Sequence, residues 1–87
     1  MSGRALLAWN LRRLRAHHQI AQERLAADAS VDRAYLSKVE RSEANPTVDV
    51  LERLADALGV SIAALFAPRA PDEAEPAPLK RGRRRAS

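Results

Sequence analysis

The 87-residue chain contains no cysteine, three aromatic residues and no long apolar run. The absence of cysteine excludes disulfide bonds and thiolate metal sites, and it fits a cytoplasmic protein. No apolar stretch approaches the roughly 20 residues of a membrane-spanning helix, and we expect no signal peptide because the N-terminus lacks a long apolar region. Trp9, Tyr35 and Phe66 are the only aromatic side chains. Leu, Val, Ile and Ala must therefore build the core, which favours helices packed on helices.

The net charge of +4 is unevenly distributed along the chain. Residues 1–66 contain nine Lys and Arg against eight Asp and Glu, whereas residues 67–87 contain six against three. A basic chain suits a polyanionic partner such as nucleic acid. Because the first 66 residues are nearly neutral, any affinity of that part for DNA must come from the placement of its charges.

Apolar residues recur at helical spacing as far as Phe66. Leu7, Leu11 and Leu14 predict one apolar stripe, and we expect Ile20 to be buried after it. The patterns predict an all-α fold of five helices at residues 4–17, 22–29, 33–41, 48–58 and 62–66.

Residues with helix-capping chemistry separate these patterns. Asp32, Thr47 and Ser61 are good N-caps because their side-chain oxygens accept hydrogen bonds from free N–H groups of the first turn. Gly59 suits the left-handed residue that follows a helix. The third, fourth and fifth helices therefore have defined starts, and the fourth has a defined end.

Beyond residue 67 the helical pattern stops. Four prolines alternate with Ala and acidic residues, and the run Lys80-Arg81-Gly82-Arg83-Arg84-Arg85 follows. Such a composition cannot form a core. We therefore expect a folded domain over residues 1–67 and a disordered tail over 68–87, whose Arg cluster either adds non-specific attraction to DNA or is unused.

The segment 21–41 carries the strongest functional signal. Two short helical patterns meet at Ser30-Val31-Asp32. The second turns Leu36 and Val39 inward and leaves short or basic side chains on its other face. A helix, a tight turn and a helix with a polar, basic face is the way in which a helix-turn-helix module presents a recognition helix to the major groove.

In combination, five short motifs resemble the lambda-repressor-like (Cro/C1, or XRE-type) DNA-binding domain over about residues 7–66. The matching segments are Leu11–Arg15, Gln22–Ala26, Tyr35–Arg41, Asn45–Thr47 and Leu54–Val60. Three positions depart from the family pattern. Ala21 replaces a capping Ser or Thr, and Ser30 and Ser42 stand where glycine is usual. We expect these departures to affect local stability and turn geometry but not the fold.

Four residues on the outward face of the third helix are candidates for reading bases. Arg33 and Lys38 can donate to guanine O6 and N7, Ala34 can touch a thymine methyl group, and Ser37 can donate or accept. The alternative is a solvated helix face without function.

Four further residues are candidates for contacts with the phosphate backbone: Gln22, Tyr35, Arg41 and Thr47. For Gln22 the resemblance implies a phosphate contact, and the alternative is an exposed residue with no role. Packing is an equally good interpretation for Tyr35. We expect Thr47 to cap a helix as well.

Other residues are expected to have structural roles. The resemblance implies an ion pair between Arg15 and Glu40. Two charges that face inward need one another, because an unpaired buried charge is very costly. The alternative is two separate surface charges. Trp9 lies off the leucine stripe, which favours partial packing over a place at a subunit interface. Ile62, Leu65 and Phe66 are the best candidates for a homodimer surface.

The sequence predicts neither a cofactor nor an enzyme. His17 and His18 are neighbours in a helix and point about 100° apart, so they cannot share a metal ion. The resemblance implies a sequence-specific transcriptional regulator of a prokaryote or phage, cytoplasmic and nucleoid-associated, that binds double-stranded DNA. We expect it to act by occupancy, as a repressor that covers a promoter or by touching polymerase from a neighbouring site. One recognition helix reads a short site, so we expect a homodimer on a pseudo-palindromic operator. The alternative is an antitoxin or adaptor whose tail binds a partner protein, but Leu79 is the only apolar anchor there.

Overall fold

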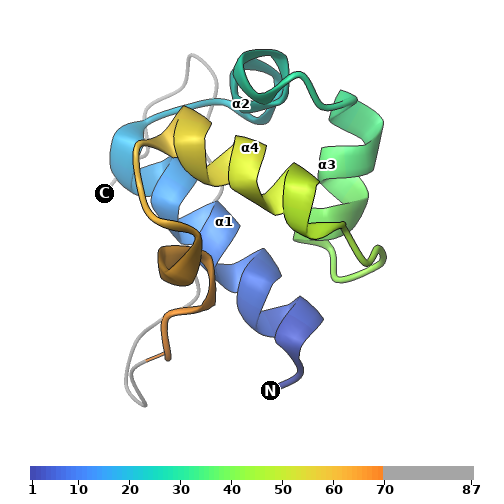
Figure 1. Cartoon of the computed structure of the whole chain (residues 1–87), viewed down its shortest axis with the longest axis vertical. Coiled ribbons are helices and arrows are strands. Elements are labelled where there is room, and N and C mark those ends of the chain that lie inside the picture. Colours follow the sequence, from blue (N-terminus) through green and yellow to red (C-terminus); the bar gives the residue numbers. More distant parts are fainter. Residues whose placement is uncertain (70–87) are drawn as a thin grey trace, which may run out of the picture.

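The computed structural model describes residues 1–69, which contain four α-helices, one short 3₁₀ helix and no strand (Figure 1). The elements are α1 (Gly3–His18), α2 (Gln22–Ala29), α3 (Arg33–Glu40), α4 (Val48–Leu58) and η1 (Ile62–Phe66). The prediction of an all-α fold is confirmed for these residues. The sequence predicts a disordered tail over residues 68–87. Residues 70–87 lie outside the part of the chain that the structure describes.

The fifth element differs from the prediction because it is a 3₁₀ helix. Its bonds span three residues, as in the 3.0 Å bond from the Ala64 N–H to the Ser61 carbonyl. Ser61 makes no side-chain capping bond, contrary to expectation. Five residues are too few to build a regular α-helical ladder, and the tighter 3₁₀ geometry is common in such short pieces.

The boundaries of two helices also shift. α1 extends by one residue at each end, and the Ser2 hydroxyl caps it by accepting from the Ala5 N–H at 3.1 Å. α3 ends at Glu40, one residue before the predicted end. Ser42 has a φ of +63°, and the Glu43 N–H returns to the Lys38 carbonyl at 2.8 Å. This left-handed reversal stops the helix before Arg41 can continue it.

The four α-helices and η1 surround one apolar core. In Figure 1, α1 and α4 cross the middle of the molecule, with α2 above them and α3 at one side. Ile20 packs against the core as expected, but it is partly rather than completely buried. The buried members of the core are Leu7, Leu11, Leu14, Leu25, Ala26, Ala29, Leu36, Val39, Leu51, Leu54, Ala55, Leu58 and Leu65.

Trp9 is fully buried, with 1% of its surface exposed, so the expectation of partial packing is wrong. The guanidinium groups of Arg13 and Arg69 each lie 5.3 Å from its ring centroid. The buried Asn10 donates to the Ala67 carbonyl at 3.0 Å and thereby holds the chain after η1 against α1. The contact joins residues 57 positions apart, which local spacing does not reveal.

Candidate DNA interface

α2 and α3 are joined by a turn whose geometry follows from its residues. Ser30 has a φ of +57°, and the Val31 N–H donates to the Ala26 carbonyl at 2.8 Å. Asp32 then caps α3, because its carboxylate accepts from the Tyr35 N–H at 3.1 Å. The turn thus joins the two helices through three residues. It forms a helix-turn-helix at the position that the sequence predicts.

The first turn of α2 lacks the side-chain hydrogen bond that caps the first turn of α4. Ala21 occupies the N-cap of α2 and makes no side-chain capping bond, as expected for alanine. The same position in α4 is held by Thr47, whose hydroxyl accepts from the Val50 N–H at 3.2 Å. The two helices therefore differ in the stability of their first turn.

α3 has a buried face and an exposed face. Leu36 and Val39 are buried at 0% and 1% exposure and anchor the helix on the core. Of the four candidate base-reading residues, Arg33, Ala34 and Lys38 are exposed and Ser37 is half-buried. The exposed side chains begin at the first residue of α3. Arg33 and Ala34 lie in the first turn, which is the end that approaches base edges in helix-turn-helix complexes, whereas Lys38 lies in the last turn.

The candidate phosphate-contacting residues fall into two groups. Arg41 and Thr47 are exposed and flank the loop between α3 and α4. Tyr35 is half-buried and packs against the core, and Gln22 is half-buried at the start of α2. The packing interpretation of Tyr35 is therefore the one that the structure supports directly.

The Arg41 side chain is held by two neighbours. Its guanidinium group donates to the Ser37 hydroxyl and lies 3.1 Å from the Glu43 carboxylate. Arg41 and Glu43 are 53% and 56% exposed, so water screens this ion pair and its contribution to stability is small. The contacts hold the guanidinium group of Arg41 between Ser37 of α3 and Glu43 of the following loop. The pairing of Arg41 with Glu43 was not predicted from the sequence.

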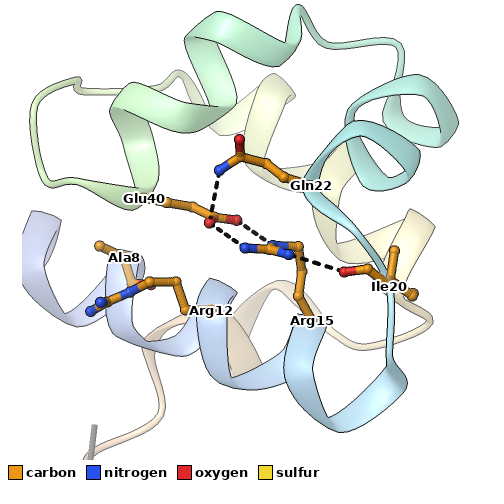
Figure 2. Close-up of polar contacts among 6 residues, drawn as sticks. All are labelled: Ala8, Arg12, Arg15, Ile20, Gln22 and Glu40. Carbon is orange, nitrogen blue, oxygen red and sulfur yellow. Dashed lines mark hydrogen bonds and ion pairs between the residues drawn. The ribbon is translucent and has the colours of Figure 1, made fainter. Parts of the chain in front are cut away.

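Arg15 and Glu40 form a bidentate ion pair, shown in Figure 2. Arg15 Nε lies 2.7 Å from Glu40 Oε2, and Arg15 Nη2 lies 2.8 Å from Oε1. The side chains are 12% and 4% exposed. Arg15 Nη1 also donates to the Ile20 carbonyl at 3.0 Å. The pair ties α1 to the end of α3 and to the segment that leads into α2.

Gln22 joins this network, which sequence analysis did not predict. Its Nε2 donates to Glu40 Oε1 at 3.0 Å (Figure 2). The bond connects the first residue of α2 with the last residue of α3. The sequence shows a polar residue at the start of α2 and another at the end of α3. It does not show that the two side chains are close, because their distance depends on how the turn folds.

The proposed dimer surface needs one correction. Leu65 is completely buried in the core and cannot contact a second subunit. Ile62 and Phe66 are 37% and 38% exposed. A five-residue apolar segment does not reveal which side chains point inward, and the core takes Leu65. The two remaining candidates stay available on the surface.

Two other features of the described residues bear on function. Within residues 1–69, no helix combines the length and the apolar composition that crossing a membrane requires. Over the same range, no three His, Cys, Asp or Glu side chains come together in a group that could hold a metal ion.

Comparison with known proteins agrees with this geometry. A family model described as "Helix-turn-helix" matches residues 11–65. The chain is 43% identical over 68 residues to an uncharacterized HTH-type transcriptional regulator of Sinorhizobium fredii, covering 78% of this chain and 88% of that protein. It is 42% identical over 65 residues to a hypothetical transcription factor of Neisseria meningitidis, covering 75% of this chain and 61% of that protein.

A solved structure has the same fold. The restriction-modification controller protein C.AhdI from Aeromonas hydrophila superposes with a TM-score of 0.71 at 33% identity, covering 72% of this chain and 96% of that one. The matched region contains α2, the turn and α3, which are the elements that carry the candidate interface. The chain belongs to the helix-turn-helix family and is a DNA-binding protein of the Cro/C1 type.

Proposed function

We propose that the protein regulates transcription by binding operator DNA with α3 in the major groove. The observation that carries the proposal is the division of α3 into two faces. Leu36 and Val39 fix one face on the core, and the other face exposes Arg33, Ala34 and Lys38. Arg and Lys donors suit guanine O6 and N7, and an alanine methyl group suits the thymine methyl. Ser37 completes the proposed base-reading set.

Contacts with the phosphate backbone flank this helix in the proposal. Gln22 precedes α3 in the motif, and Arg41 and Thr47 follow it. Thr47 uses its hydroxyl oxygen to cap α4, but the hydroxyl hydrogen remains a donor for a phosphate. Tyr35 takes part only through its hydroxyl, because its ring packs against the core. Phosphate contacts fix the register of the helix, and base contacts supply the sequence preference.

Repression by occupancy as a homodimer is the mode of action that we propose. Each base pair contributes roughly 1–3 kcal/mol of discrimination, so one short recognition helix selects a site poorly. Two copies on a pseudo-palindrome double the number of base pairs that are read. Ile62 and Phe66 are the proposed contacts between the copies. Their exposure supports the proposal, and an apolar pair on the surface is suited to self-association.

Selection of bound duplexes from a random pool tests the proposal and supplies the operator. Titrations with the selected operator and with random DNA then compare Arg33→Ala and Lys38→Ala with the wild type. We expect specific affinity to fall far more than non-specific affinity. Arg24→Ala is the matched control, because Arg24 is 72% exposed on α2 and pairs with Asp28. Equal losses on both DNAs for the two α3 variants would contradict base reading.

A further inference from the structure

The Gln22 side chain has a fixed orientation in the structure. A carboxylate accepts hydrogen bonds and has none to donate, so the amide nitrogen of Gln22 must face Glu40. The observed bond from Nε2 to Oε1, 3.0 Å long, has this orientation. Figure 2 shows the amide oxygen on the side away from the carboxylate. Within residues 1–69, this bond is the only one that the Gln22 side chain makes.

The Glu40 carboxylate is itself held independently of Gln22. Arg15 donates to both of its oxygens at 2.7 and 2.8 Å. Arg15 is fixed in turn by the Ile20 carbonyl at 3.0 Å. Because Glu40 is only 4% exposed, its side chain has little room to move. The carboxylate is thus a rigid acceptor at the point where α2 begins.

An amide nitrogen carries two hydrogens, and Glu40 uses one of them. We propose that Glu40 is a positioning residue for DNA binding: it holds one N–H of Gln22 and leaves the second N–H for a DNA phosphate. The inference rests on the proposed function, in which Gln22 contacts the backbone. Without Glu40, the amide is free to rotate and to present its oxygen, which repels a phosphate. The ion pair therefore serves the interface as well as the fold.

A double-mutant cycle on a random-sequence duplex tests this inference, because phosphate contacts do not depend on sequence. Gln22→Met keeps the side-chain length and removes both N–H groups. It should weaken binding by about threefold to tenfold, as expected for one hydrogen bond. Glu40→Met, which removes both acceptor oxygens, should weaken binding to a similar degree, and adding it to Gln22→Met should have no further effect. Such coupling would not arise from a purely structural role.

Glu23→Met provides the matched control. Glu23 is the exposed neighbour of Gln22 in α2, and no contact with the network involves it. Both Glu→Met changes remove one negative charge, so electrostatics alone predicts tighter DNA binding for both. Positioning predicts weaker binding for Glu40→Met only. Because Gln22 is neutral, Gln22→Met should also leave the slope of log affinity against log salt unchanged.

Nuclear magnetic resonance of the isotope-labelled wild-type protein gives a second readout, which does not depend on how well the Glu40 variant folds. The two Nε2 protons of Gln22 should have distinct resonances in the free protein. Titration with the duplex should shift one of them and leave the Glu40-bound proton in place. A bound complex in which neither proton shifts, or in which the Glu40-bound proton is released, would overturn the inference.

The two proposals fail in different ways. A wild-type protein that binds no duplex at low salt refutes the proposed function. A wild-type protein that binds, combined with additive effects of Gln22→Met and Glu40→Met, refutes only the positioning role. Tighter binding by Glu40→Met, parallel to Glu23→Met, would likewise refute positioning and leave the DNA-binding function intact.

Discussion

Glu40→Ala should destabilise the protein far more than the loss of a surface charge would. The change leaves Arg15 without its carboxylate in a site where its side chain is 12% exposed. It also removes the acceptor of the Gln22 amide. Breaking a buried ion pair from one side costs roughly 3–5 kcal/mol, because the remaining charge stays desolvated.

The expected magnitude lies at the lower end of that range. Water reaches part of Arg15, and its bond to the Ile20 carbonyl persists in the variant. We therefore expect a decrease of about 3 kcal/mol in the free energy of unfolding. For a domain of this size, each kcal/mol lowers Tm by about 4–8 °C, so the melting temperature should fall by roughly 12–24 °C.

Thermal and denaturant unfolding followed by circular dichroism measure this decrease. Glu52→Ala is the control, because Glu52 is an exposed residue of α4 whose removal breaks no described contact. Arg15→Met combined with Glu40→Met should recover much of the stability, since an apolar pair replaces the buried charges. A Tm for Glu40→Ala that matches the Glu52→Ala control would refute the reasoning.

Three other changes have defined outcomes. Ser30→Gly should raise the free energy of unfolding by about 0.5 kcal/mol. Glycine relieves the strain of a φ of +57°, and its greater flexibility in the unfolded chain offsets part of this gain. The control Ser61→Gly, at a φ of −77°, should lower the free energy of unfolding. Ala21→Ser should add up to about 1 kcal/mol by capping α2, whereas Ala27→Ser, inside the helix, should not. Truncation after Arg69 removes the basic run at residues 80–85 and should leave the fold intact. If this run binds DNA, the truncation should flatten the slope of log affinity against log salt by roughly 0.9 for each phosphate that the run neutralises. Identical slopes for the full and truncated chains would contradict a role of the run on DNA.

Local signals in the sequence were sufficient for most of the fold. The leucine stripe of α1 follows from helical periodicity, and Asp32 and Thr47 cap helices because their side chains reach the first turn. Gly59 adopts the expected left-handed conformation. All of these features depend on residues a few positions apart. The spacing of the side chains along the chain therefore determines them.

Features that depend on distant contacts escaped prediction. Trp9 is buried, and residue 67 lies against α1 because Asn10 binds its carbonyl, a contact over 57 positions. Leu65 faces inward because the core has room for it, which a five-residue segment cannot indicate. The Gln22–Glu40 bond joins two helix ends that only the turn at Ser30 brings together. Each of these contacts requires knowledge of how the helices pack.

The placement of α3 links the stability of the fold to the function that we propose. Asp32 caps its first turn, Leu36 and Val39 fix its middle on the core, and Glu40 joins its last residue to α1 and α2. A recognition helix held at both ends loses little conformational entropy when it binds, and a rigid support keeps its side chains within reach of the bases. Variants that loosen Glu40 should therefore weaken DNA binding even at temperatures at which the domain remains folded.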